Sequence, residues 1–189
     1  MTTIITILTE GYADWETALL NAVARSYYNI DTKFATPGGE PVTSSGGLRV
    51  TPDLAVEEIN VAEIDALVVN GGTAWSQPAA PDIRQALVFA TKAGKIVAGI
   101  CDGTRPLALA GLLDGVMHTS NSAATLSGTG YMGLPRYQDQ PTAVVDGKIV
   151  TAPGTAPVSF AGGIMQALTL RDGNLDFYLK MHGAEHRVA

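Results

Sequence analysis

Cysteine is nearly absent from this sequence, which carries one cysteine, Cys101, in 189 residues. A single cysteine can form neither an intramolecular disulfide framework nor a multi-cysteine zinc site. Basic residues are also few: 12 lysines and arginines stand against 18 acidic residues, so the net charge is −6, and no basic stripe is present. This balance argues against nucleic acid and anionic membranes as partners.

Long apolar runs are missing as well. No stretch approaches the length of a membrane span, and the first residues, "MTTIITILTEGYADWE", lack the basic flank and cleavage site of a secretory signal. We therefore expect a cytoplasmic protein without a membrane segment. With 46% hydrophobic and 16% charged residues, the chain has a globular composition, and its length suits one domain over residues 1–189.

Short apolar segments alternate with helical patterns along the chain. Buried strands are expected at 3–9, 31–37, 65–72 and 95–100, antiparallel segments at 40–56 and 142–152, and helices at 14–28, 81–94, 103–113, 157–170 and 174–183. Asp14 is expected to cap the first of these helices, with Leu20 and Ala24 on its inner face. The alternation predicts right-handed βαβ crossovers, and therefore a three-layer α/β/α sandwich with a mostly parallel central sheet.

The one cysteine stands where such a sheet binds its ligands. Cys101 directly follows the strand "KIVAGI" and precedes a helix, in the order Gly99-Ile100-Cys101-Asp102-Gly103. This is the thiol version of the Gly-x-Ser-x-Gly nucleophile elbow, in which the glycines remove side chains that would clash in a tight turn. The N–H groups of the following helix are expected to lower the thiol pKa. We interpret Cys101 as a nucleophile rather than as a small buried apolar residue.

Several segments together resemble a known family. "VVNGG", "AGICDGT", "LALAGLLDG", "HTSN" and "TAPGT" occur in the order found in the ThiJ/PfpI superfamily, relatives of class I glutamine amidotransferases, and "GYADWE" resembles its bacterial branch. The resemblance spans nearly the whole chain. It implies a flavodoxin-like fold, a homodimer, and Cys101 as the reactive centre, with no cofactor.

The resemblance also implies roles for individual residues. Glu16 matches the acidic partner, whose protonated carboxyl hydrogen-bonds the thiolate sulfur in that family. Gly72 matches a position whose backbone N–H helps to form an oxyanion hole, and the N–H of Asp102 would be the second donor. Beside these roles stand ordinary ones: Glu16 on a solvated helix face, Gly72 in a turn, and Asp102 capping the elbow helix or pairing with Arg105.

Two departures concern the catalytic base. The protease-like branch has a histidine directly after the cysteine, where this chain has Asp102, so peptidase activity is not expected. Another branch has a histidine where this sequence has Asn121. His118, three residues earlier, is the remaining candidate for a catalytic histidine, or else a structural residue.

Three further residue pairs have ordinary interpretations. His182 and His186 have the spacing of a helical metal site, but two ligands without a third seldom bind a metal, so no metal site is expected. Trp15 and Trp75 line the pocket mouth or, more ordinarily, pack in the core. Asp14, which stands close to Glu16, is expected only to cap its helix.

Three functions remain open from the sequence. The first is a small-molecule hydrolase, amidase or glyoxalase/deglycase-like enzyme in which Cys101 attacks an electrophilic carbon and Glu16 shuttles a proton. The second is an oxidative-stress sensor in which Cys101 is oxidised to a sulfinate, since no second cysteine can resolve it. The third is a scaffold that has lost its activity, which an unreactive Cys101 would indicate.

Overall fold

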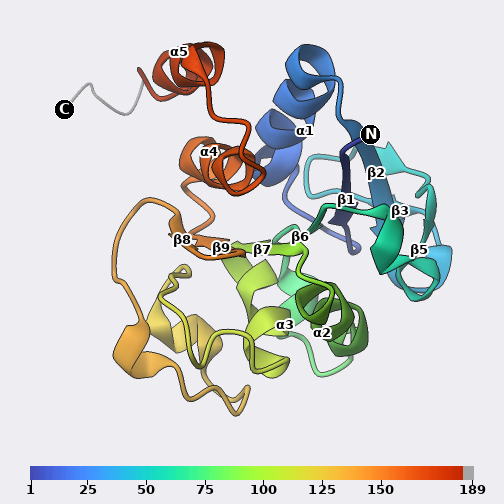
Figure 1. Ribbon diagram of the computed structural model, residues 1–189. Coiled ribbons are helices and arrows are strands. Elements are labelled where there is room, and N and C mark those ends of the chain that lie inside the picture. The colour runs from blue at the N-terminus through green and yellow to red at the C-terminus, as the bar shows by residue number, and fades with distance from the viewer. Residues whose placement is uncertain (185–189) are drawn as a thin grey trace.

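The computed structural model of the protein describes residues 1–184 and shows one large sheet between two layers of helices (Figure 1). Its seven strands lie in the order β5-β2-β1-β6-β7-β9-β8, and all neighbours are parallel except β8 and β9. The strands are β1 (Thr3–Ile7), β2 (Asp31–Thr36), β5 (Leu54–Ala55), β6 (Ala66–Val69), β7 (Ile96–Ile100), β8 (Val144–Asp146) and β9 (Ile149–Ala152). The predicted flavodoxin-like α/β/α sandwich is confirmed.

Helices cover both faces of this sheet. One face carries α1 (Asp14–Tyr28) and α4 (Pro157–Ala167), with α5 (Gly173–His182) packed against α4, and the opposite face carries α2 (Arg84–Lys92) and α3 (Thr104–Leu109) (Figure 1). The expected antiparallel excursion is present as a separate pair, β3 (Val42–Thr43) with β4 (Arg49–Val50). None of the helices within residues 1–184 is long and apolar enough to cross a membrane.

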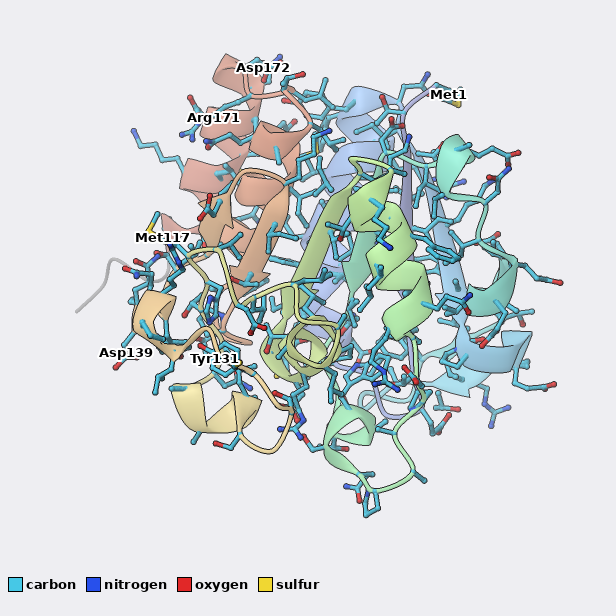
Figure 2. All side chains as sticks on the ribbon, turned by 60° about the horizontal axis from the view of Figure 1, so that its bottom comes forward. Met1, Met117, Tyr131, Asp139, Arg171 and Asp172 are labelled. Atoms are coloured by element: carbon cyan, nitrogen blue, oxygen red, sulfur yellow. The ribbon has the colours of Figure 1, made fainter. Side chains whose placement is uncertain are left out.

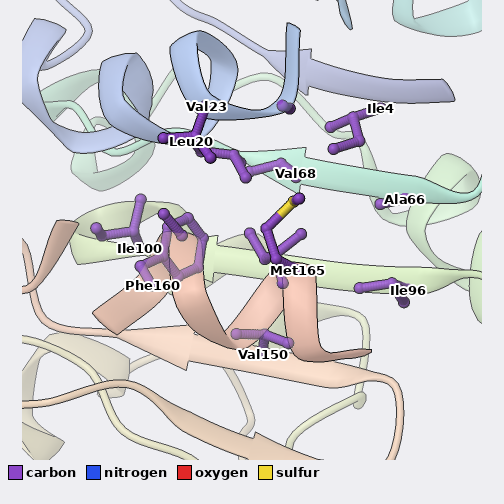
Figure 3. Packing of buried hydrophobic residues seen from close by; sticks show 14 of the residues in the cluster. Ile4, Leu20, Val23, Ala66, Val68, Ile96, Ile100, Val150, Phe160 and Met165 are labelled. Atoms are coloured by element: carbon purple, nitrogen blue, oxygen red, sulfur yellow. The ribbon is translucent and has the colours of Figure 1, made fainter. Parts of the chain in front are cut away.

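The core explains why the sequences of the central strands are nearly continuous apolar runs. Strands β1, β6, β7 and β9 are buried along their whole length because helices cover both faces of the sheet. Figure 3 shows Leu20 and Val23 of α1 and Phe160 and Met165 of α4 packed against strand residues that include Val68 of β6 and Ile100 of β7. Burying each large apolar side chain contributes about 1.5–3 kcal/mol, so the sheet is a rigid support for the loops at its carboxyl edge.

Some element ends differ from the sequence-based expectations. Helix α3 ends at Leu109 rather than at residue 113, and Gly111 then turns the chain with a φ of 71°. Asp14 is not the N-cap of α1: Ala13 holds that position, and Asp14 is the first helical residue. The Asp14 carboxylate instead accepts a hydrogen bond from the Gly46 N–H at 2.8 Å, so it anchors the loop between β3 and β4.

Candidate active site

Cys101 occupies a strained turn at the carboxyl end of β7. Its φ is 57°, a left-handed backbone conformation that is uncommon for a residue with a side chain. A short 3₁₀ turn over Cys101–Gly103 leads directly into α3. A Cβ atom on Gly99 would lie 2.7 Å from the Gly103 carbonyl oxygen, so the turn closes only with glycine there. The local geometry is that of the nucleophile elbow expected from the sequence.

Glu16 lies in the first turn of α1 and points into the molecule. The residue is 1% exposed, and its Oε2 accepts a hydrogen bond from the Gly71 N–H at 2.8 Å. The carboxyl lies beside Cys101: a Cβ atom on Gly71 would overlap with Glu16 Oε2 and lie 2.6 Å from Cys101 Cβ, and the interaction with the thiol lowers the pKa of the carboxyl. Its Oε1 has no hydrogen-bond partner in the described part of the chain. The structure therefore brings Glu16 to Cys101, as the resemblance implies.

Two glycines form the walls around this pair. A Cβ atom on Gly71 would lie 2.6 Å from the Cys101 Cβ, and one on Gly154 would lie 2.8 Å from Glu16 Oε1 and 3.0 Å from Cys101 Sγ. Side chains essentially never approach so closely. Gly71 follows β6 and Gly154 follows β9, the two strands that flank β7. The backbones of the loops after β6 and β9 thus contact the thiol and the carboxyl directly.

Asn121 completes the surroundings of the sulfur. Its Oδ1 accepts a hydrogen bond from the Gly154 N–H at 2.9 Å, which fixes the orientation of the amide. The Nδ2 group then donates to Cys101 Sγ at 3.1 Å and to Asp102 Oδ1 at 3.3 Å. The residue that stands in place of a histidine is therefore a hydrogen-bond donor to the thiol. An amide cannot act as a base, so its contribution is to stabilise negative charge on sulfur.

Burial dominates the ionisation of this pair. Burial raises the pKa of the Glu16 carboxyl to about 7, while hydrogen bonds with the thiol and the Gly71 N–H oppose the rise. Burial also raises the pKa of the Cys101 thiol to about 12; the Asn121 amide and the Asp102 N–H oppose this rise, and the Glu16 carboxylate adds to it. The expected lowering of the thiol pKa by elbow amides is thus not found, because burial and Glu16 outweigh them.

Asp102 faces the opening of the site. Its Oδ2 accepts a hydrogen bond from the Ser76 hydroxyl at 2.7 Å, and its Oδ1 accepts the one from Asn121. It neither caps the elbow helix nor pairs with Arg105, which donates instead to the backbone carbonyls of Trp75, Thr125 and Ser127. The Asp102 backbone N–H lowers the pKa of the Cys101 thiol, against the larger effect of burial.

The two tryptophans have different surroundings. Trp75 is 2% exposed and donates its indole N–H to the Asn70 carbonyl at 2.9 Å, so it packs in the core as expected. Trp15 is 58% exposed and therefore is not a core residue. Its indole N–H donates to the Gly154 carbonyl at 3.3 Å, which holds the ring at the mouth of the site.

His118 is fully buried, and both of its ring nitrogens are engaged. The Val116 carbonyl can only accept, so Nδ1 carries the proton and donates to it at 2.8 Å, whereas Nε2 accepts from the Tyr131 hydroxyl at 2.6 Å. Burial lowers the pKa of His118. Figure 2 shows Tyr131 in the long loop between α3 and β8. Neither nitrogen contacts Cys101 or Glu16, so the structure does not bring His118 into the site.

Gly72 follows Gly71 and pairs with Tyr12 through an isolated β-bridge. The Glu16 carboxyl takes the Gly71 N–H, not that of Gly72. The role of Gly72 and Asp102 as oxyanion donors stays a prediction. Within residues 1–184, no group of three or more His, Cys, Asp or Glu side chains is arranged to hold a metal ion. His182 ends α5, and its partner His186 lies outside the described residues.

A separate cavity of about 840 Å³ lies between α4, α5 and β8. Thr155 and Ala156, which follow Gly154, contribute to its lining, together with apolar residues such as Val145, Val158 and Leu179. Cys101 and Glu16 do not line it. This cavity is therefore separate from the Cys101–Glu16 pair.

Sequence reasoning assigned no role in the site to Gly71, Gly154 or the Asn121 amide. Signals for them existed. "TAPGT" places Gly154 directly after β9, and "VVNGG" places Gly71 after β6. Loops that follow neighbouring parallel strands meet at one edge of the sheet, so both glycines were candidates for contact with Cys101.

The chain is similar to a family model, to solved structures and to curated proteins. The family model described as DJ-1/PfpI family matches residues 2–167. A solved DJ-1 superfamily protein, Atu0886 from Agrobacterium tumefaciens, is 44% identical with a TM-score of 0.96, over 99% of this chain and 100% of that one. The "uncharacterized protease YoaZ" of Bacillus subtilis (strain 168) is 33% identical over 165 residues, 82% of this chain and 78% of that protein.

Other relatives bear other activity names. One from Caenorhabditis elegans is named glutathione-independent glyoxalase DJR-1.2 and is 28% identical over 142 residues, 74% of each chain. One from Pyrococcus abyssi (strain GE5 / Orsay) is named deglycase PYRAB04690 and is 41% identical over 83 residues, 42% of this chain and 48% of that protein. The names point to enzymes, but to more than one reaction.

Proposed function

Because this chain belongs to the DJ-1/PfpI family, as its sequence motifs indicate, we propose that it is a cysteine-dependent enzyme acting on a small molecule. Cys101 is the nucleophile, Glu16 is its acidic partner, and the reaction is a hydrolase, amidase or glyoxalase/deglycase-like one. The observation that carries this proposal is the contact between Cys101, whose backbone is strained and whose thiol is half-buried, and the Glu16 carboxyl, which is 1% exposed.

The contacts favour a single proton held by Glu16 and a negative charge held by sulfur. Two groups in contact titrate as a pair, here with one proton released near pH 7 and the second near pH 12. Between those values one negative charge is shared. A thiolate has the Asn121 amide and the Asp102 N–H as donors besides the Glu16 proton, whereas a Glu16 carboxylate has the Gly71 N–H besides the thiol proton. Charge is therefore better stabilised on sulfur.

In this arrangement the thiolate adds to the carbonyl carbon of an amide or an α-oxoaldehyde; a hemithioacetal substrate reacts after it has released its thiol. The oxygen of that carbon becomes an oxyanion, which the N–H groups of Gly72 and Asp102 are proposed to stabilise.

With an amide, the Glu16 proton goes to the leaving amine and a thioester remains. With an α-oxoaldehyde, the Glu16 proton goes to the oxyanion, and the C–H proton of the resulting hemithioacetal then moves to the neighbouring carbonyl carbon, which also gives a thioester. Water hydrolyses the thioester to a carboxylic acid and the free thiol, from which Glu16 regains its proton. Peptide hydrolysis is not favoured, because His118 is engaged elsewhere.

The test is a turnover screen with α-oxoaldehydes, their hemithioacetals with small thiols, and small primary amides. We expect turnover of at least one class, its loss by about a hundredfold or more in Cys101→Ser, and a loss of about tenfold or more in Glu16→Gln. Glu63→Gln is the matched control, since it removes an exposed carboxylate from the turn that precedes β6, at the opposite edge of the sheet. Absence of turnover in all classes, with an intact thiol, would contradict the enzyme proposal.

A second candidate, oxidation sensing, is favoured by the same donors around sulfur. In this scheme two equivalents of hydrogen peroxide each transfer one oxygen atom to Cys101 and leave as water, giving a sulfinate. The Glu16 carboxyl and the Asn121 amide are placed to donate to its oxygens. Because the chain has one cysteine, oxidation cannot end in an internal disulfide. A two-oxygen mass increase confined to Cys101, with no turnover in the screen, would favour this function.

A further inference from the structure

We propose that the mouth of the Cys101 site selects substrates with a positively charged group near the electrophilic carbon, and disfavours carboxylates. Ammonium, quaternary ammonium and guanidinium groups belong to the favoured class. This inference rests on the proposed role of Cys101 as the nucleophile. Two residues at the opening carry it: the carboxylate of Asp102 and the indole of Trp15.

Asp102 places a negative charge beside the sulfur without a basic partner. A single nitrogen, Asn121 Nδ2, is 3.1 Å from Cys101 Sγ and 3.3 Å from Asp102 Oδ1, so only this amide separates the two. The ion pairs within residues 1–184 are Lys33–Asp31, Arg84–Asp82 and Arg171–Asp176, none of which involves Asp102. Arg105, three residues along the chain, donates its hydrogen bonds to backbone carbonyls. The charge of Asp102 is therefore not neutralised by the protein.

The charge of Asp102 reaches the catalytic pair. It contributes to the raised pKa of Glu16, although burial is the main cause. A substrate that brings a second carboxylate to this mouth would meet that charge at short range. A substrate that brings a cation would be attracted by it, because attraction and repulsion at the same distance differ only in sign.

Trp15 supplies an apolar face on the same mouth. Its indole N–H is tied to the Gly154 carbonyl, and Gly154 itself closes on the sulfur. The indole is thus tied to the loop that closes on the sulfur, while 58% of the residue remains exposed. An exposed indole attracts cations over its π face. Asp102 and Trp15 therefore recognise the same chemical class.

Charged thiol reagents test this preference without knowledge of the substrate. Three methanethiosulfonates are compared, with trimethylammonioethyl, hydroxyethyl and sulfonatoethyl groups. In each reaction Sγ forms a bond to the reagent's thioalkyl sulfur, the S–SO₂ bond breaks, and methanesulfinate leaves with the electron pair. Rate constants are divided by those of a neutral cysteine amide, which removes the intrinsic reactivity of each reagent.

After this division, we expect the cationic reagent to react with the native protein at least about ten times faster than the anionic reagent. Asp102→Asn should lower this cation-to-anion rate ratio about tenfold. Trp15→Leu should lower the cation-to-neutral ratio about threefold and leave the anion-to-neutral ratio unchanged. The controls are Glu63→Gln and Tyr27→Leu, the latter removing a ring that is 55% exposed at the other end of α1.

The outcomes separate this inference from the proposed function. If the hydroxyethyl reagent reacts readily but the ratio stays near one in the native protein and both variants, the charge preference is overturned and the nucleophile proposal stands. If Cys101 resists even the neutral reagent, the nucleophile proposal fails, and this inference fails with it. A ratio that changes equally in the control variants would also overturn the roles of Asp102 and Trp15.

Discussion

Two polar centres of this protein, the His118 ring and the Cys101–Glu16 pair, are built in opposite ways. Asn121, which donates to Cys101, is three residues from His118 in the loop after α3. The His118 ring is fully buried with a partner for each nitrogen. The Cys101–Glu16 pair combines a φ of 57° at the cysteine with a buried carboxyl oxygen that has no hydrogen-bond partner within residues 1–184.

This difference separates a structural site from a reactive one. A buried polar group with all partners present stabilises the fold and has nothing left to offer a substrate. A strained backbone and an incompletely paired carboxyl lower stability, and such features gather where a protein does chemistry. Histidine is the more common base, yet here the reactive centre is the thiol–carboxyl pair. The same contrast predicts opposite pH dependences of stability for the two centres.

The largest expected effect concerns Glu16. The folded Glu16–Cys101 pair keeps its first proton up to about pH 7, whereas an unfolded Glu16 carboxyl loses its proton near its ordinary pKa of 4.5. The stabilising contribution of this proton is therefore complete below the unfolded value and is lost as the pH rises through the folded one. Glu16→Gln should therefore match the native protein near pH 4 and exceed its free energy of unfolding by about 3 kcal/mol near pH 8. Urea unfolding across this range measures the difference. Parallel curves for the two proteins would contradict it.

A smaller change in the free energy of unfolding, and of opposite sign, is expected when His118 is replaced. His118→Leu leaves the Tyr131 hydroxyl and the Val116 carbonyl without their partner, which should lower the free energy of unfolding by about 2 kcal/mol. Burial lowers the pKa of His118 in the folded protein, so its contribution is present above the unfolded value and lost as the pH falls. The gap between native protein and variant should therefore shrink in acid. A large change in Cys101 alkylation rate in this variant would contradict a purely structural role.

Asn121 is close to His118 in sequence but contacts Cys101, so its substitution should change the pKa of the thiol. Asn121→Ala removes the amide donor to sulfur, so the apparent thiol pKa should rise by about one unit. The pH dependence of iodoacetamide alkylation measures it. Ser122→Ala, next in the chain, is the control, and an equal shift in that variant would assign the effect to the loop rather than to the amide.

The smallest effect tests the strain at the elbow. Because Cys101 has a positive φ, Cys101→Gly should be more stable than Cys101→Ala by about 1 kcal/mol. At Ala98, an ordinary β7 position, the sign should reverse, and glycine should be less stable than alanine by about 1 kcal/mol. Thermal unfolding compares the pairs. Equal signs at both positions would remove the evidence for strain.

The elbow itself could be predicted because its information is local. A buried strand, glycines on both sides of Cys101 and a following helix lie within a short segment, and the strand–helix alternation gave the sheet that carries them. Glu16 was reached through the family resemblance, because no rule of spacing links the first turn of α1 to a residue 85 positions later. Its contact depends on how α1 packs against the sheet.

The parts that could not be predicted depend on loops meeting in space. Whether His118 or Asn121 reaches the sulfur is decided by the path of the loop after α3, and the shorter helix and the turn at Gly111 set that path. The exposure of Trp15 depends on the Gly154 loop, since the indole is tied to it. A tryptophan in an apolar-rich helix is by composition a core residue, so the sequence favoured the opposite interpretation.

The most direct test of the thiolate–acid pair is the thiol pKa of Cys101 in the native protein and in Glu16→Gln, from the pH dependence of alkylation. If protonated Glu16 donates to the thiolate, the first proton of the pair, released near pH 7, comes from the thiol, and Glu16→Gln raises the thiol pKa because a weaker donor replaces the acid. If Glu16 instead carries the charge, the native thiol titrates near pH 12, and Glu16→Gln lowers its pKa by removing the repulsion. We predict the first result; the second would contradict a thiolate nucleophile at neutral pH.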